Sequence, residues 1–133
     1  MAIPTRRLGR TGHQSSVAIL GAAAFARSNE KDTEAAFTEA LARGVNHLDI
    51  APSYGDAERL VGPLVPAVRD KLFVGCKTHR RNADGVRAQL ENSLGLLGCD
   101  QFDLYQMHGV TSLEILDERA PAAAIRYRGI PDH

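Results

Sequence analysis

The sequence predicts an α/β fold built on a parallel sheet, and two observations carry that prediction. Short apolar runs typical of strands alternate with segments of helical periodicity. The apolar runs at 45–50, 72–77 and 102–108 begin 27 and 30 residues apart, which is the length of a βα unit. Strands separated by helices need crossover connections, and such connections give parallel pairing.

The composition is that of an ordinary globular protein. The chain has 133 residues, of which 44% are hydrophobic and 24% charged, and its formal net charge is zero. These values exclude a disordered or collagen-like chain and give no basic field for nucleic acid. No apolar run reaches the roughly 18 residues of a membrane span, and the N-terminus lacks the apolar core of a signal peptide. Cys76 and Cys99 lie at no metal or redox spacing, so we expect reduced thiols in a cytoplasmic protein.

The N-terminal part is predicted to contain a turn and a short strand. Two glycines around a polar pair in 8–12 are typical of a tight turn, and the apolar run 17–20 favours a strand that ends at Gly21. A polar loop over 26–32 follows.

The first helix is predicted over 33–43. Asp32 suits its N-cap, and Gly44 stands where a helix C-terminus favours positive φ. Its apolar face consists of Ala36, Phe37, Ala40 and Leu41.

Two further helices are expected between the later strands. A helix that begins after Asp56 should be short or broken before Val68, because Pro63 and Pro66 interrupt it. The next helix, capped by Asn82, has the strongest periodicity in the chain. Its apolar positions are Val86, Leu90, Leu94 and Leu97.

Beyond residue 108 the pattern is weaker. Thr111 and Glu114 have the spacing of a capping box that would open a short helix, and Pro121 would end or kink it. The run 125–130 favours a fifth strand. We therefore expect a single domain over 1–133, with a hairpin and first strand in 1–20, βα units in 32–108, and a shortened helix and fifth strand in 109–133.

Ionisable side chains stand at the ends of successive strands. Asp49, Lys77 and His108 each end a predicted strand, and Tyr54 lies in the loop after the first of them. Because the carboxyl ends of parallel strands meet at one edge of a sheet, these groups should converge in one cleft.

Their chemistry is complementary. An ammonium beside a tyrosine favours the phenolate and lowers the phenol pKa from its usual value of about 10, while a carboxylate holds the ammonium in place. With an imidazole to orient a carbonyl, such a set can donate a proton to an oxygen that gains negative charge. Each residue alone has a simpler interpretation: Asp49 as a loop cap, Lys77 as a surface charge, His108 as a partly buried histidine and Tyr54 as a packed loop anchor. Their combination favours a functional cleft.

The stretch 44–62 resembles the signature of the aldo-keto reductase family. That signature runs Gly, a short strand, Asp, Thr, Ala, a few residues, Tyr, Gly, then Glu and Gly, and here Ile50 replaces the usual Thr after the aspartate. Residues 8–12 are similar to the N-terminal hairpin that closes the barrel floor in this family, and 94–108 resemble its third helix and fourth strand. The resemblance covers nearly the whole chain up to His108 and implies a (β/α)₈ barrel.

The resemblance also implies an activity, the NADPH-dependent reduction of an aldehyde or ketone to an alcohol. By this resemblance Tyr54 is the general acid, Lys77 lowers its pKa, Asp49 pairs with Lys77, and His108 orients the carbonyl. The substrate would be a small carbonyl compound whose identity depends on later loops of the barrel.

For the cofactor, the resemblance implies a site that this chain contains only in part. Gly21 and Ala22 match the family's turn after the first barrel strand, and Asp49 completes the cofactor-binding positions. Such barrels need about 250 residues, so we expect a partial barrel of about four βα units plus a fifth strand. Pro131–His133 stand where the family has a polar pair that holds the nicotinamide, and the late phosphate clamp has no counterpart.

Two functions therefore stay open, a reductase and a non-catalytic remnant or half-barrel binding protein. Half a barrel exposes strand edges and an interior face, which predicts a homodimer or a complementary half-barrel chain. His47 is expected to be structural, and 79–81 to be a solvated loop, with contact to the cofactor phosphate as the alternative. The residues expected to face the interior are Val45, His47, Asp49, Phe73, Gly75, Lys77, Phe102, Leu104, Gln106 and His108.

Overall fold

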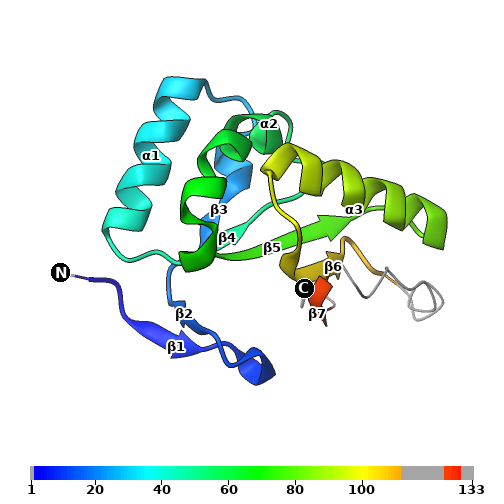
Figure 1. Cartoon of the computed structure of the whole chain (residues 1–133), viewed down its shortest axis with the longest axis horizontal. Coiled ribbons are helices and arrows are strands. Elements are labelled where there is room, and N and C mark those ends of the chain that lie inside the picture. Colours follow the sequence, from blue (N-terminus) through cyan, green and yellow to red (C-terminus); the bar gives the residue numbers. More distant parts are fainter. Residues whose placement is uncertain (1, 112–124, 130–133) are drawn as a thin grey trace.

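The computed structural model of the chain describes residues 2–111 and 125–129. Parallel strands form one sheet in the order β3-β4-β5-β6-β7, as an α/β fold with crossover connections requires. Three α-helices lie along one side of this sheet (Figure 1), and an N-terminal hairpin packs near the amino ends of its strands, where His13 stacks on Phe73. The strands are β3 (Leu20–Gly21), β4 (His47–Asp49), β5 (Phe73–Thr78), β6 (Phe102–Met107) and β7 (Ile125–Gly129).

The hairpin pairs β1 (Thr5–Arg7) antiparallel with β2 (Gln14–Ser16) through a 3₁₀ turn, η1 (Gly9–Thr11). The predicted strand over 17–20, ending at Gly21, is confirmed only at its end, as β3, and is wrong over 17–19. Val17 still belongs to the hairpin, since its N–H donates to the Pro4 carbonyl at 2.9 Å, and 17–18 form a bend. The first strand of the parallel sheet is therefore only β3.

The first helix, α1 (Glu30–Ala42), begins three residues earlier than predicted, and Asp32 is not its cap. The cap is Asn29, whose side-chain oxygen accepts from the Asp32 N–H at 2.9 Å. Of the expected apolar face, Phe37 is buried but Ala36 is exposed. Gly44 has a φ of 93°, which confirms the expected left-handed position after the helix.

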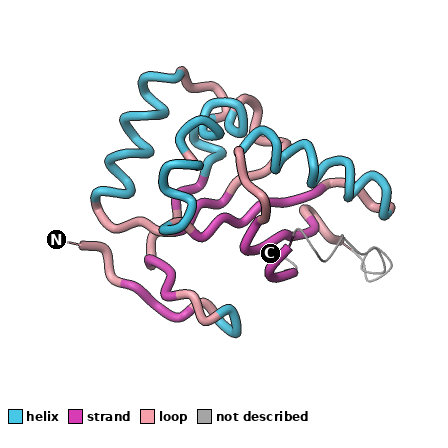
Figure 2. The backbone as a smooth tube through the Cα atoms, viewed as in Figure 1, coloured by secondary structure: helices cyan, strands magenta, loops and turns pink. Residues whose placement is uncertain are grey.

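The second helix is short, as its prolines predict. α2 (Ala57–Val61) is followed by two 3₁₀ helices, η3 (Gly62–Leu64) and η4 (Pro66–Lys71), each with a proline at its start. Asp56 precedes α2 but makes no capping bond with its side chain. A further 3₁₀ turn, η2 (Ala22–Phe25), follows β3, and the succession of helices and strands can be followed along the tube in Figure 2.

The third helix, α3 (Ala83–Leu97), confirms the strongest helical pattern of the sequence. The Asn82 side chain accepts from the Gly85 N–H at 2.7 Å and so caps it. Val86, Leu90 and Leu97 are buried against the sheet, and Leu94 is half-buried.

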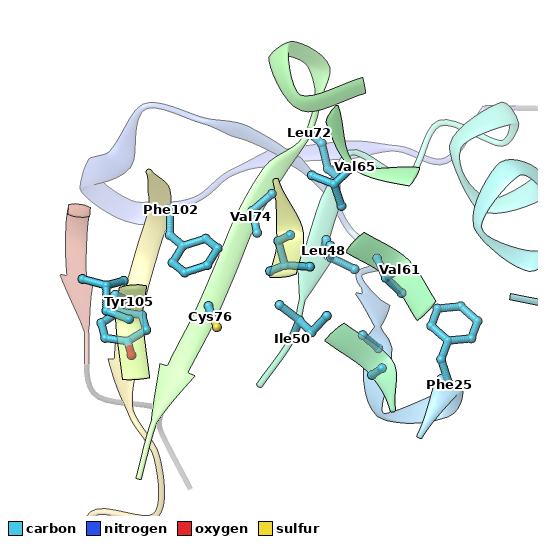
Figure 3. Close-up of a cluster of buried hydrophobic side chains, with 14 of the residues drawn as sticks. Phe25, Leu48, Ile50, Val61, Val65, Leu72, Val74, Cys76, Phe102 and Tyr105 are labelled. Atoms are coloured by element: carbon cyan, nitrogen blue, oxygen red, sulfur yellow. The ribbon is translucent and has the colours of Figure 1, made fainter. Parts of the chain in front are cut away.

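The core fills the space between the helices and the sheet (Figure 3). Phe102 belongs to this core and not to the barrel interior as predicted. The hydrogen-bonded ladder between β5 and β6 begins only at the pair Gly75 and Leu104. Before that pair, the Val74 N–H donates a hydrogen bond to the Asp103 carboxylate at 2.8 Å and is not available to the ladder. In this irregular stretch the Phe102 ring is fully buried and stacks on Tyr105, with centroids 6.0 Å apart. Burial of the phenyl surface stabilises this arrangement.

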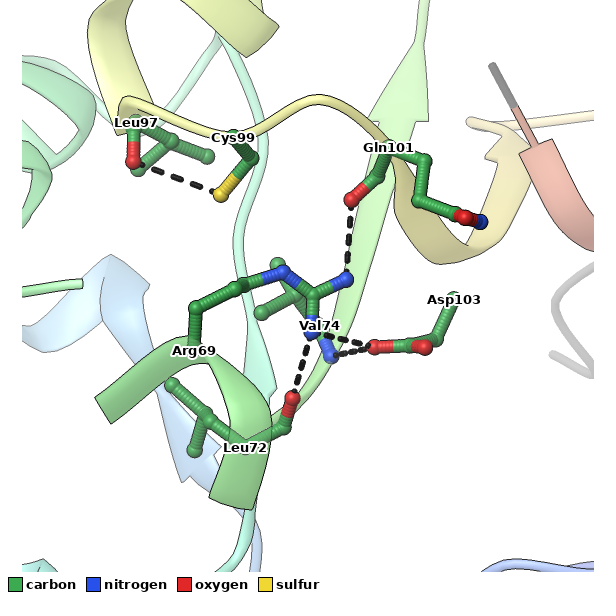
Figure 4. A network of polar contacts seen from close by, with 7 residues as sticks. All are labelled: Arg69, Leu72, Val74, Leu97, Cys99, Gln101 and Asp103. Atoms are coloured by element: carbon green, nitrogen blue, oxygen red, sulfur yellow. Dashed lines mark hydrogen bonds and ion pairs between the residues drawn. The ribbon is translucent and has the colours of Figure 1, made fainter. Parts of the chain in front are cut away.

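A polar network ties η4 to the starts of β5 and β6 (Figure 4). The Arg69 guanidinium donates to the Leu72 carbonyl at 2.7 Å and to the Gln101 carbonyl at 2.8 Å. It also lies 2.9 Å from the Asp103 carboxylate. These contacts fix the amino ends of the two central strands, which sets the register at their carboxyl ends.

The chain after residue 111 is described only over β7, which pairs parallel with β6. This confirms the expected fifth strand over most of its predicted range, and the structure describes only its backbone. The capping box at Thr111 and Glu114, the helix after it and Pro131–His133 lie outside the described residues.

Candidate active site

Strand register places three positions side by side at the carboxyl edge of the sheet. Gly21 of β3 lies opposite Asp49 of β4, and Asp49 lies opposite Gly75 of β5. Lys77 follows Gly75 by two residues, and side chains two apart point to the same face of a strand. Asp49 and Lys77 therefore project from neighbouring strands toward the face of the sheet opposite the buried core.

Asp49 and Lys77 form an ion pair. The Lys77 Nζ donates to Asp49 Oδ1 at 2.5 Å. The lysine side chain is 8% exposed and the aspartate side chain 32% exposed, so the ammonium is largely shielded while the carboxylate keeps contact with solvent. A shielded charge needs a partner, and this one has the carboxylate.

The loop after β4 brings Tyr54 over the same lysine. Its N–H donates to the Ala51 carbonyl at 3.1 Å and its carbonyl accepts from Ala57 at 2.9 Å, so the tyrosine is held in a turn that leads into α2. The Lys77 Nζ lies 5.1 Å from the centroid of the Tyr54 ring. This is within the range of a cation–π contact.

Gly55 allows this turn to approach the η2 turn after β3. Its φ is +51°, a conformation that L side chains rarely adopt, and a Cβ there would collide with the Ala26 carbonyl. The same carbonyl accepts from the Asp56 N–H at 3.1 Å. The close approach of this turn to Ala26 therefore requires a glycine directly after Tyr54.

His108 comes to the same place from the end of β6. Its N–H donates to the Thr78 carbonyl at 2.8 Å, and its ring meets the Tyr54 ring edge-on, with centroids 6.1 Å apart at 83°. The Nδ1 atom is shielded from solvent and has no hydrogen-bond partner among the described residues. Burial lowers the pKa of His108, and the neighbouring His79 and Lys77 lower it further.

The structure thus brings together the four side chains predicted from the strand ends: Asp49, Tyr54, Lys77 and His108. The expected cofactor-binding residues Gly21 and Ala22 differ in their exposure to solvent. Gly21 is exposed beside Asp49, and no heavy atom lies within 4 Å of the place where a Cβ would stand. Ala22 is fully buried, so only its backbone is able to meet a ligand.

Two neighbours of this site, His79 and Arg81, belong to the basic segment 79–81, for which the sequence left open a solvated loop or contact with a cofactor phosphate but did not predict contact with His108. The segment after Lys77 was expected to be a solvated loop, yet the His79 ring lies 4.4 Å from the His108 ring, centroid to centroid. The Arg81 guanidinium donates to the His108 carbonyl at 2.5 Å. A cluster of basic residues directly after a strand-end lysine was the signal available, and its contacts depend on how β5 and β6 pair.

The opposite end of the sheet has a different character. His13 of the hairpin stacks on Phe73 at 4.6 Å, and His47 meets Phe73 at 4.8 Å. His47 is buried and its Nδ1 lies 2.9 Å from the Ser15 hydroxyl, which fits the structural role expected for it. A hollow of about 830 Å³ opens here, lined by residues that include Thr11 and Arg69, but it lies at the amino ends of the strands, away from the ionisable groups.

Within the described ranges, no group of three or more histidine, cysteine or acidic residues is placed to hold a metal ion. No helix in the same part of the chain is long and apolar enough to cross a membrane.

The sequence model of the Aldo/keto reductase family matches residues 18–120. The chain belongs to this family. A 6-dehydroglucose reductase of Novosphingobium aromaticivorans is 28% identical over 152 residues, which cover 94% of this chain and 50% of that protein. The chain spans half or less of the length of the first curated relatives that it matches.

Solved aldo-keto reductases share the fold. A protein of this description from Pseudomonas aeruginosa has a TM-score of 0.84 at 25% identity, over 95% of this chain and 59% of that one. Another, from Klebsiella pneumoniae in complex with NADPH, has a TM-score of 0.77 at 22% identity, over 100% of this chain and 51% of that one. The aldo-keto reductase sheet of this chain is thus part of a (β/α)₈ barrel, as its sequence predicts.

Proposed function

We propose that this aldo-keto reductase chain supplies the catalytic half of an NADPH-dependent carbonyl reductase. The observation that carries the proposal is a chain of contacts at the carboxyl edge of the sheet. Asp49 pairs with Lys77, Lys77 lies over the Tyr54 ring, and that ring meets His108. Carbonyl reduction needs an acid beside the carbonyl oxygen, and this series offers a phenol flanked by an ammonium and an imidazole.

In this proposal Tyr54 donates its proton to the carbonyl oxygen as negative charge develops there. The Lys77 ammonium, 5.1 Å from the ring centroid, stabilises the phenolate left behind, and Asp49 keeps that ammonium in position. Since Nδ1 of His108 is shielded, Nε2 is the ring nitrogen left to hydrogen-bond the substrate oxygen. The substrate class is an aldehyde or ketone.

The residues present fit a nicotinamide cofactor at the edge of β3 and β4. Gly21 leaves open space beside Asp49 where any other side chain would project. When bound, NADPH supplies the hydride that reduces the carbonyl carbon. In this chain Gly21 and Asp49, with the backbone of Ala22, would hold the nicotinamide end of the cofactor.

The open edge of the described sheet at β3 favours a second candidate. In this alternative the chain is a non-catalytic half-barrel that binds a partner at that edge. The two candidates differ in whether NADPH binds and is consumed.

The test is a calorimetric titration with NADPH followed by an assay with small aldehydes. Calorimetry is the method of choice because the chain has no tryptophan whose fluorescence could report binding. Saturable binding with one site per chain and conversion of the aldehyde to its alcohol support the reductase. No binding up to about 1 mM, a free energy weaker than roughly 4 kcal/mol, would favour the half-barrel candidate.

A further inference from the structure

The segment directly after Lys77 holds His108 from three sides. Its carbonyl at Thr78 accepts the His108 N–H at 2.8 Å, and the Arg81 guanidinium donates to the His108 carbonyl at 2.5 Å. Between these two backbone contacts, the His79 ring lies against the His108 imidazole with centroids 4.4 Å apart and planes inclined at 32°.

This segment is itself fixed to α3. The Gln89 side-chain oxygen accepts from the Thr78 hydroxyl at 2.6 Å and from the His79 N–H at 2.9 Å. The Thr78 hydroxyl in turn accepts from the Arg80 N–H at 3.0 Å. The turn that carries His79 therefore has a defined conformation, and the ring contact follows from it.

We propose that His79 is a positioning residue for His108, covering one face of the imidazole so that the ring stays uncharged and oriented toward the substrate oxygen. The inference rests on the proposed reductase function for its consequence in catalysis. The contact itself is independent of that function.

The surroundings of His108 explain why a second imidazole would have this effect. Burial disfavours a proton on the ring, positive charge on His79, Lys77 of β5 and Arg81 of the following turn repels one, and Asp49 of β4 attracts one. Tyr54 meets the ring edge-on. The His79 ring also lies against the His108 imidazole, and exclusion of water by this ring contact favours the neutral form.

The test uses His79→Ala and His79→Phe in the full chain. His79 is largely exposed, so its replacement should not disturb the core. Nuclear magnetic resonance of labelled imidazoles follows the titration of each histidine, with His108→Gln to assign its signal. We expect the His108 titration to lie below the ordinary 6.5 in the wild type, to move up toward 6.5 in His79→Ala, and to stay low in His79→Phe, whose ring covers the same face.

His47, at the other end of the sheet, is the internal control for the fold, and its signal should not change. An unchanged His108 titration in His79→Ala overturns the proposal, and so does an ordinary titration in the wild type. Both results are obtained without any turnover, so they are separate from a failure of the reductase function.

If the protein is active, the pH profile of kcat separates a positioning role of His79 from a role in stability alone. The acid side of the kcat profile should move to higher pH in His79→Ala, because His108 would gain its proton sooner as the pH falls. Activity would then fall most near pH 6 and least at alkaline pH. A uniform loss at every pH would contradict the positioning role.

Discussion

Lys77 is the residue on which the proposed chemistry depends most, because it contacts both Asp49 and the Tyr54 ring. We predict that Lys77→Met lowers kcat by about 100-fold or more, the usual effect of losing one partner in proton transfer. Lys71, exposed in η4, provides the matched control as Lys71→Met. The measurement compares the kcat of the two variants at the same NADPH concentration. Similar losses of kcat in the two would contradict the role of Lys77.

His47 makes stability depend on pH. Burial, with a smaller contribution from His13, lowers the pKa of His47 from 6.5 to about 4. Above pH 6.5 the residue is neutral in the folded and unfolded states, so it contributes no pH dependence. As the pH falls from 6.5 to about 4, only the unfolded chain takes up the proton, and the free energy of unfolding falls by at most about 3 kcal/mol.

The check is urea denaturation of the wild type and of His47→Gln at several values of pH. The variant should lose less stability than the wild type between pH 6.5 and pH 4. Parallel pH curves for the two proteins would show that this histidine has no such role.

Among single residues, the sequence predicted that the four side chains at or after strand ends converge. This prediction needs only the alternation of side chains along a strand and the fact that parallel strands end at one edge of a sheet, and no knowledge of packing. It did not predict the contact of His79 with His108. That contact joins the turn after β5 to the end of β6, and it depends on the register of Gly75 with Leu104.

At the scale of elements, α2 and α3 are joined through a glycine. A Cβ on Gly62 would collide with the Leu96 carbonyl, whereas a Cβ on Gly95, inside α3, meets nothing within 4 Å. We predict that Gly62→Ala lowers the free energy of unfolding by about 1–3 kcal/mol. Gly95→Ala should raise it by about 0.5–1 kcal/mol, because alanine favours a helix interior. Denaturant titration of both variants checks this pair, and equal effects would contradict the close approach.

The errors in the predicted elements concern boundaries and irregular pairing. Asp32 and Asn29 are both good caps, and local sequence does not decide between them; the structure uses Asn29. Phe102 has the parity of the barrel interior, but the bond from Val74 to the Asp103 carboxylate displaces the ladder and the ring enters the core. Such side-chain competition with a backbone ladder is not visible in a pattern of alternation.

At the scale of the whole molecule, the sheet in the described part of the chain is open and not closed into a barrel. Its outer strand β3 pairs on one side only with β4, and Val17 and Ile19 beside it are 53% and 48% exposed. Open edges next to apolar side chains favour pairing with another chain. We predict that the protein forms dimers or larger assemblies.

Sedimentation velocity measures this directly. Ile19→Lys, which puts a charge beside the open edge, should shift the distribution toward monomer, while Leu96→Lys, at a similarly exposed site on α3, should leave it unchanged. A stable, compact monomer of the wild type would contradict the expectation.

In the proposed reaction Tyr54, which lies beside Lys77, protonates a carbonyl that is reduced at the expense of NADPH. The most direct measurement compares the rate of NADPH-dependent aldehyde reduction by Tyr54→Phe and Tyr105→Phe. Each variant removes one phenolic oxygen, but Tyr105 is a buried core residue on the helical side of the sheet. We predict that Tyr54→Phe loses about 100-fold or more in kcat while Tyr105→Phe keeps its rate. Equal rates in the two variants would contradict it.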